Sequence, residues 1–148
     1  MLGEPQPQGS KTIVKRRTGR PILLEDNPGT KPWRARVEAA AAEAMNGQQI
    51  RTGPLRLTVT FVFLRPAGHW GTGRNSGRLK PSAPLYVRTR PDVDKLLRAV
   101  GDSLVGHVCR DDAQIVISHA EKHYGEPACA HIVVDEVALE DDRPVVEP

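Results

Sequence analysis

The ten residues from Leu55 to Leu64, LRLTVTFVFL, limit the possible folds of this chain more than any other stretch. Apolar side chains recur there at every second position, which is typical of a β-strand with a buried face. The later half is also apolar on the opposite face, as expected for a strand with neighbours on both sides. The sequence therefore predicts a central strand with one face formed by Leu55, Leu57, Val59, Phe61 and Phe63.

Two helices are predicted, one before and one after that strand. The first covers Trp33 to Met45, where alanine is frequent. Thr30 is expected as its N-cap, and Asn46-Gly47 should end it. The second covers Asp92 to Val105, in which apolar residues recur at helical spacing, and Gly106 closes it.

Four further segments are strand candidates. Thr12–Lys15 and Pro21–Leu24 are short, whereas Gln114–Tyr124 and Ala128–Glu136 are longer. The longer two are joined by Gly125-Glu126-Pro127, a composition that predicts a hairpin. Together the elements predict an α+β fold, in which a small mixed β-sheet packs with two main helices in a single domain.

Charge divides the chain into regions. Residues 65–91 contain six basic residues and no acidic one, and so long a loop without periodicity is generally functional or disordered. Residues 1–30 form a basic segment rich in Pro and Gly, which we assign to the same domain, and residues 31–136 form its core. Residues 137–148 are expected to be an acidic, disordered tail. The basic body suits a polyanion, although a solvated basic surface is an equal alternative.

Several classes of protein are excluded or disfavoured by the sequence. The longest apolar runs are far too short to span a bilayer, so no membrane partner is expected. The first ten residues lack an apolar stretch and a basic lead, so we expect no secretory signal and a cytoplasmic location. Its two cysteines are then expected to be reduced thiols. No Walker A pattern is present and no G-x-G-x-x-G follows a strand, so no organic cofactor is expected.

Four acidic residues flank the second predicted helix and could do chemistry. Asp92 and Asp94 form a D-x-D at its start, and Asp111 and Asp112 follow the short connection after its end. Carboxylates converging from these places suit Mg²⁺, which prefers oxygen ligands and leaves room for water and substrate phosphate. Two such ions could clamp the attacking and leaving oxygens of a phosphodiester.

The same acidic residues also suit structural roles. Asp92 can cap the helix, Asp94 can complement its dipole, and Asp111-Asp112 can be turn residues. Asp102 lies late in the helix, where an acidic side chain opposes the dipole. We therefore expect Asp102 to have a specific partner, either a basic residue or a backbone amide.

Other side chains near these acidic residues have two interpretations each. Arg98 follows Asp94 by four residues and could either pair with it or stabilise charge on a phosphate. Lys95 could contact a backbone phosphate or be solvated. Trp70, next to His69 in the basic loop, could stack on a base or pack onto the core.

The string RPDVDKLLRAVGDSLVGHVCRDDAQIVISHAEKHYGEP, residues 90–127, resembles the signature of RusA-type Holliday junction resolvases. The resemblance rests on a D-x-D opening a helix, an acidic residue near its end, a D-D-x-Q and a strand ending in K-x-Y-G. It extends more weakly to the strand 55–64, to R-P-x-x-H from Arg65 to His69, and to P-x-P-Q-G from Pro5 to Gly9.

The resemblance implies a function and a site. Asp92, Asp94 and Asp112 match the metal-binding carboxylates of the family, Asp111 lies beside them, and Asp102 matches a recurrent acidic residue. The family consists of small homodimeric endonucleases, common in phages and prophages, that need Mg²⁺ or Mn²⁺. They nick two opposed strands of a four-way DNA junction in recombination and repair, and a two-fold symmetric dimer suits that substrate.

Two departures from the family pattern fall in the helix, where Lys95 replaces an Asn and Arg98 replaces a Lys. Arginine keeps the positive charge but cannot transfer a proton. The resemblance thus implies Asp92, Asp94, Asp112 and Arg98 as catalytic residues. A non-catalytic module that binds branched DNA, or a nuclease for flaps or forks, remains an alternative. The residues expected to bind DNA are basic: Lys15, Arg16, Arg17, Arg65, Arg74, Arg78, Lys80, Arg88, Arg90 and Lys95.

Overall fold

The computed structural model describes residues 1–9, 11–14, 22–25 and 27–138 of the chain. The elements follow in the order β1 (Lys11–Val14), β2 (Ile22–Glu25), α1 (Thr30–Met45), β3 (Leu55–Phe63), α2 (Val93–Leu104), β4 (Ile115–Tyr124) and β5 (Cys129–Glu136). Three single-turn 3-10 helices, η1 (Ala67–His69), η2 (Gly73–Asn75) and η3 (Asp112–Gln114), lie in the connections. The predicted α+β fold with a small mixed sheet and two main helices is confirmed.

β3 is the centre of a three-stranded sheet in the order β4-β3-β5. It pairs in parallel with β4, from Leu55 beside Ile115 to Phe63 beside Tyr124, and antiparallel with β5. Its residues alternate between buried and half-buried, with Leu55, Leu57, Val59, Phe61 and Phe63 in the core. The prediction of a central strand is confirmed.

The predicted hairpin between the last two strands is wrong. β4 and β5 do run in opposite directions, but β3 lies between them and each pairs with β3. The connection crosses the end of β3, where the backbone N–H of Gly125 donates to the carbonyl of Phe63 at 3.0 Å. A Cβ at Gly125 would lie 2.8 Å from Cγ1 of Val62, so the glycine permits this close crossing. Turn composition predicts that the chain reverses but does not say which strands become neighbours.

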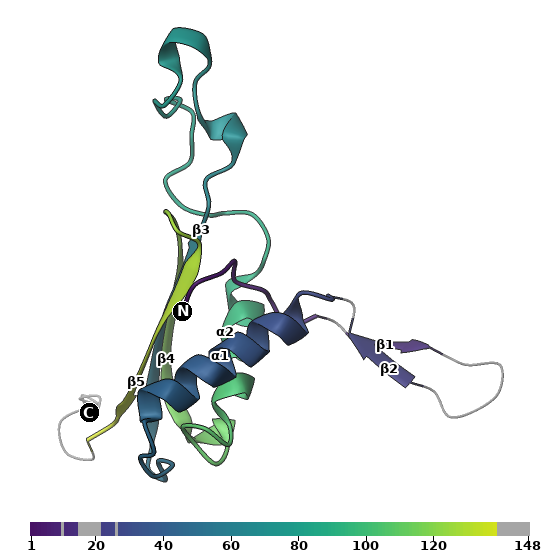
Figure 1. Cartoon of the computed structure of the whole chain (residues 1–148), viewed down its shortest axis with the longest axis vertical. Helices are drawn as coiled ribbons and strands as arrows, with labels where there is room; N and C mark the ends of the chain where they lie inside the picture. The colour runs from purple at the N-terminus through teal and green to yellow at the C-terminus, as the bar shows by residue number, and fades with distance from the viewer. Residues whose placement is uncertain (10, 15–21, 26, 139–148) are drawn as a thin grey trace, which may run out of the picture.

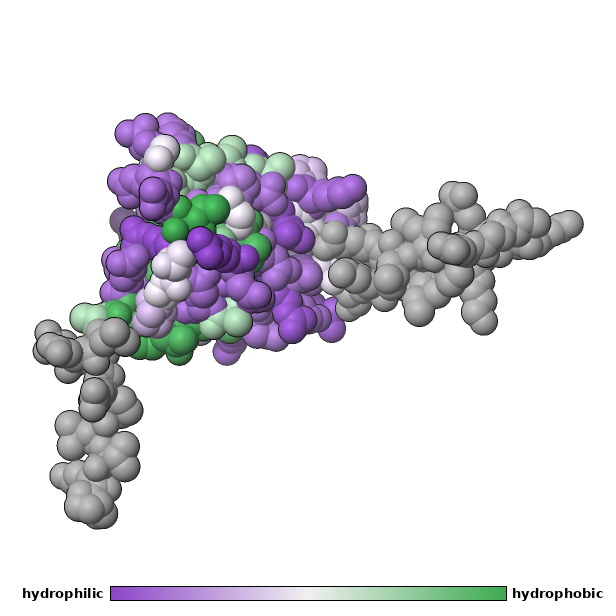
Figure 2. Space-filling view, turned by 90° about the horizontal axis from the view of Figure 1, so that it is seen from below, coloured by the Kyte–Doolittle hydropathy of each residue, from purple (hydrophilic) through white to green (hydrophobic). Residues whose placement is uncertain are grey.

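Both main helices lie against the same face of the sheet (Figure 1). Trp33 of α1 packs against Phe61 of β3, with ring centroids 6.4 Å apart, and both side chains are fully buried. The buried side of α2 adds Leu96 and Val100 to the same core. Figure 2 views the end of the domain where both helices finish, and the surface there is mostly hydrophilic with scattered apolar patches.

The two ends of α1 differ in how well the sequence predicts them. Asn46 ends the helix in the left-handed conformation with φ 44°, as expected for a residue that terminates a helix. Thr30 is not the N-cap, which is Gly29. The Thr30 hydroxyl is buried and donates to the carbonyl of Pro7 at 2.7 Å, so a tertiary contact uses the group that would have capped the helix.

Two parts of the N-terminal region are described. Residues 1–3 run beside β5, where the N–H of Ala130 donates to the carbonyl of Met1 and the N–H of Gly3 donates to that of Ala128. β1 and β2 pair with each other in a separate antiparallel sheet that projects from the domain (Figure 1). Lys15, Arg16 and Arg17 lie outside the described residues, as do positions 139–148 of the expected acidic tail.

Residues 65–86, which we call the arm, leave the carboxyl end of β3 and project away from the sheet (Figure 1). The arm is not structureless. It contains η1 and η2, and Trp70 forms a β-bridge with Leu79. The chain re-enters the core at Val87, which is only 6% exposed. Across the described ranges, no helix combines the length and apolar character that a membrane crossing requires.

The crossing at Gly125 leads to a stability prediction. We expect Gly125→Ala to lower the free energy of unfolding by about 1–3 kcal/mol, because the added methyl group would overlap Val62. Adding Val62→Ala should recover most of that loss. Gly68→Ala is the control, since nothing lies within 4 Å of a Cβ at Gly68. Urea unfolding followed by circular dichroism measures all four proteins, and an equal loss in both glycine variants would contradict the close crossing.

Candidate active site

A cleft of about 410 Å³ lies between α2 and the edge strand β4 and collects three of the acidic residues. We call it the acidic cleft. Its polar residues are Asp94, Lys95, Arg98, Asp102, Asp112 and Ser118, and its apolar residues are Leu57, Leu97, Gly101 and Ile115. Two of the predicted metal ligands, Asp94 and Asp112, are thus brought to one place from opposite ends of α2.

One face of α2 carries the charged wall of this cleft. Asp94, Arg98 and Asp102 follow one another at intervals of four residues, which places them one above another on a helix. The opposite face is buried and includes Leu96, Val100 and Leu104. The amphipathic pattern that packs α2 into the core therefore also points these charges away from it.

Apart from Lys95, the charged side chains of the acidic cleft have no partners within the described part of the chain. Asp94, Arg98, Asp102 and Asp112 make no side-chain hydrogen bond or ion pair with any described residue. The possible pair between Asp94 and Arg98 does not form. The specific partner predicted for Asp102 is not found among the described residues, and this carboxylate lines the acidic cleft. Its position four residues after Arg98 and eight after Asp94 is the sequence signal that could have placed it there.

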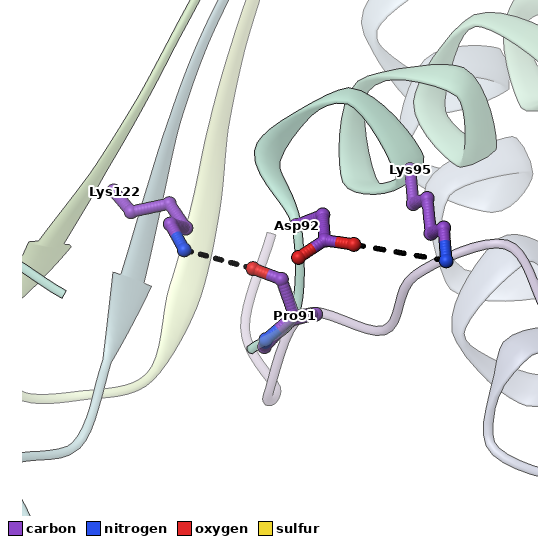
Figure 3. Close-up of polar contacts among 4 residues, drawn as sticks. All are labelled: Pro91, Asp92, Lys95 and Lys122. Carbon is purple, nitrogen blue, oxygen red and sulfur yellow. Dashed lines mark hydrogen bonds and ion pairs between the residues drawn. The ribbon is translucent and has the colours of Figure 1, made fainter. Parts of the chain in front are cut away.

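Asp92 occupies a different position from its neighbour Asp94. It is the N-cap residue of α2, but its carboxylate makes no capping hydrogen bond. Its Oδ2 lies 3.6 Å from Nζ of Lys95 (Figure 3). Both side chains are about half exposed, so this pair contributes little to stability. Asp92 lines an adjoining cleft together with Arg90, Lys95 and residues 4–9.

Lys122 of β4 fixes the segment that leads into α2. Its Nζ donates to the carbonyls of Thr89 and Pro91, both at 2.8 Å, and the contact with Pro91 is drawn in Figure 3. These bonds connect β4 to the backbone immediately before Asp92. The sequence contains Lys122 within the K-x-Y-G at the end of the strand, but the spacing gives no sign of this positioning role.

Gln114 fixes the turn that carries Asp111 and Asp112. Its Oε1 accepts hydrogen bonds from the backbone N–H groups of Arg110 and Asp111, at 2.9 and 3.2 Å. Its Nε2 donates to the carbonyls of Arg51 and Gly53, at 3.1 and 3.0 Å. The turn is thereby attached to the segment that precedes β3.

Asp111 and Asp112 have different surroundings within that turn. The Oδ1 of Asp111 accepts from the N–H of Ala113 at 2.8 Å and caps η3, so Asp111 fills the structural role that its position also suited. Asp112 faces the acidic cleft. Burial and the charges of Asp112 and Asp111 raise the pKa of the nearby Cys109 thiol. The thiol therefore stays protonated at neutral pH, which argues against a nucleophilic role for Cys109.

The donors in the acidic cleft fit Mg²⁺ or Mn²⁺ shared with a phosphate. Within the described residues, no group of three or more His, Cys, Asp or Glu side chains could hold a metal ion alone. Mg²⁺ usually takes only one or two protein carboxylates and completes its shell with water and substrate phosphate oxygens. Asp94 and Asp112 supply two such carboxylates, and Asp102 supplies a third along the same wall.

The predicted DNA-binding residues that the structure describes are spread over three places. Arg74, Arg78 and Lys80 are exposed on the arm, whereas Arg90 and Lys95 line the cleft beside Asp92. Arg88 is exposed on the segment that leads back towards α2. The guanidinium of Arg65 already has one partner within the protein, because its Nη1 donates to the carbonyl of Pro84 at 2.8 Å. Apart from Lys95, none of these lines the acidic cleft.

Comparisons with known proteins agree with this arrangement. The sequence model of a protein family described as Endodeoxyribonuclease RusA matches residues 3–135, a range that includes both helices, the arm and the acidic cleft. The Bacillus subtilis (strain 168) protein YqaN, described as uncharacterized, is 29% identical over 141 residues. That alignment covers 93% of this chain and 94% of YqaN. The family resemblance noted for residues 90–127 is confirmed.

The four hydrogen bonds of Gln114 make a prediction about stability. We expect Gln114→Leu to lower the free energy of unfolding by about 1–3 kcal/mol, because it leaves backbone groups of the turn without partners. Gln48→Leu is the matched control, since Gln48 is exposed. Urea unfolding measures both. Equal stability of the two variants would show that Gln114 does not fix the turn.

Proposed function

We propose that this chain, which belongs to the RusA endodeoxyribonuclease family, resolves four-way DNA junctions by paired nicks with Mg²⁺ or Mn²⁺ as its cofactor. The observation that supports this most strongly is the acidic cleft, where three carboxylates without partners among the described residues share the lining with Arg98 and Lys95. Carboxylates that have no neutralising partner attract a cation, and this attraction lowers the free energy of binding it in the cleft. A structural ion-pair network would instead have paired these charges with one another.

Asp94 and Asp112 would hold the cation, with Asp92 contributing from the adjoining wall. The half-exposed pair between Asp92 and Lys95 is weak enough for a cation to compete with the ammonium group. Such an ion supplies Lewis-acid chemistry at a phosphodiester. Lys122 on one side and Gln114 on the other hold the backbone that carries these carboxylates, so the ligands would be positioned before a cation binds.

Arg98 would stabilise the negative charge that grows on the scissile phosphate. It lies between Asp94 and Asp102 on α2 and forms no ion pair among the described residues, so its donors are available to substrate oxygens. Because a guanidinium stays protonated, Arg98 cannot act as a general base. Its role would be electrostatic alone.

The basic residues would hold the DNA duplexes by their phosphates. The arm presents Arg74, Arg78 and Lys80 to solvent, and Arg88 and Arg90 continue the basic surface towards α2. Lys15, Arg16 and Arg17 would add to it. Contacts of this kind set position and affinity rather than sequence preference. A homodimer would place two acidic clefts on opposed strands of one junction, as two symmetric nicks require.

Cleavage is tested with a labelled synthetic four-way junction, and with a linear duplex of the same sequence beside it. We expect nicking of the junction with Mg²⁺, no nicking with EDTA, and at least a hundredfold slower nicking by Asp94→Asn, because removing the charge weakens cation binding. Glu43→Gln, an exposed substitution on α1, is the control and should nick at the wild-type rate.

The other outcomes of this experiment identify other functions. Tight binding of the junction without cleavage, in either Mg²⁺ or Mn²⁺, would replace the nuclease with a DNA-binding module, and Arg98→Lys would then be the first variant to examine. Faster cleavage of flaps or forks than of four-way junctions would change the substrate but keep the chemistry.

The arm makes a separate prediction about DNA affinity. Arg74→Ala and Arg78→Ala should each weaken binding to every DNA substrate and reduce the slope of log K against log salt by about 1 if they contact phosphates. Lys31→Ala on α1 is the control. Fluorescence anisotropy at several salt concentrations, without divalent ions, measures the slopes. An unchanged slope in both variants would exclude phosphate contacts by Arg74 and Arg78.

A further inference from the structure

A second pocket lies at the base of the arm, where β3 and β4 end. It has a volume of about 450 Å³, and we call it the aromatic pocket. The residues that line it are Leu64, Arg65, Trp70, Tyr124, Gly125 and Glu126. None of them lines the acidic cleft, so this is a separate site.

The walls of the aromatic pocket are held in place by contacts within the protein. The guanidinium carbon of Arg65 lies 4.4 Å from the centroid of the Tyr124 ring, and Nη1 of the same side chain donates a hydrogen bond to the carbonyl of Pro84. His69 meets the same tyrosine ring edge-on, with centroids 5.4 Å apart. Trp70 is fixed by its bridge to Leu79 and by a backbone hydrogen bond to Ala67. The pocket is therefore preformed.

Trp70 differs from the other tryptophan of the chain. Trp33 is fully buried in the core, whereas 37% of Trp70 is exposed. The alternative that Trp70 packs onto the core therefore does not apply. An indole left partly exposed beside a tyrosine, an arginine and a carboxylate offers flat apolar faces together with hydrogen-bonding groups. This combination suits a flat aromatic ligand with polar edges, and a nucleobase is such a ligand.

The surroundings favour a base that belongs to DNA. The arm above the pocket carries Arg74, Arg78 and Lys80, all exposed, and residues 65–91 include no acidic residue. A base inside a duplex is stacked on both faces and is pulled out at a cost, whereas a base pair at an open branch point has lost a stacking neighbour on one side, so its bases are extruded at a lower cost. A branch point would therefore supply the ligand most readily.

We propose that the aromatic pocket stacks one nucleobase that leaves its pair at the branch point of a bound DNA junction. This inference rests on the proposed function, because it assumes that branched DNA is the substrate. Ser118 in the acidic cleft and Tyr124 in the aromatic pocket are six residues apart on β4, which corresponds to about 20 Å. One strand thus connects the base-binding site to the proposed cleavage site.

The test compares binding of a four-way junction with binding of a linear duplex, both in EDTA so that no cleavage occurs. Trp70→Ala should weaken junction binding about 5- to 30-fold and duplex binding less than about 2-fold, because extruding a base costs less at the branch point than inside a duplex. Trp70→Phe keeps an aromatic ring and should restore most of the affinity. Leu85→Ala is the control, since Leu85 is 74% exposed on the arm and does not line the pocket.

A second measurement separates failure of this inference from failure of the proposed function. A short oligothymidine should quench Trp70 fluorescence, seen as the signal present in the wild type and missing in Trp70→Ala. Quenching in a protein that neither prefers nor cuts junctions would support the base site and overturn the proposed function. Junction cleavage without quenching would overturn the base site alone, as would equal losses of junction and duplex binding in Trp70→Ala.

Discussion

The two hydrogen bonds from Lys122 to the carbonyls of Thr89 and Pro91 are the contact on which the rest of the site depends. They connect the edge strand β4 to the chain between the arm and α2. The arm therefore returns to a fixed place, and α2 begins beside β4 with Asp94 facing the acidic cleft. One ammonium group makes both bonds. The basic arm and the acidic cleft are therefore held in a fixed position relative to each other.

The sequence was most informative where the pattern is local. Alternation from Leu55 to Phe63 predicted the strand, and the apolar residues on the second face of its later half predicted its central place, although that face is only half-buried. It was least informative about pairing. The Gly125 turn predicted a hairpin because local composition records a reversal of the chain, whereas the insertion of β3 between β4 and β5 is set by contacts far apart in sequence. The prediction of Thr30 as an N-cap failed for the same reason, because its hydroxyl donates to the carbonyl of Pro7, which is distant in sequence.

The candidate site was predictable in its residues but not in its arrangement. Asp94 and Asp112 could be named from their places at the two ends of α2, and they do share one cleft. The separation of Asp92 from Asp94 could not be predicted, because it depends on the direction of a side chain at the helix start. Lys122 and Gln114 were part of a recognisable motif, yet their roles appear only when β4 and the segment before β3 are seen side by side.

The parallel pairing of β3 with β4 has a consequence for how the arm can change. Parallel neighbours require a long crossover connection, and here that connection contains the arm and then α2. The pairing of β3 with β4 holds the two ends of this crossover together. Doubling the length of a flexible loop raises the entropic cost of closing it by only about 0.6 kcal/mol. We therefore expect changes in length at the outer part of the arm to leave the strand register and α2 almost undisturbed. The length of the arm, and with it the area of substrate that the protein can contact, can therefore vary while the acidic cleft stays the same.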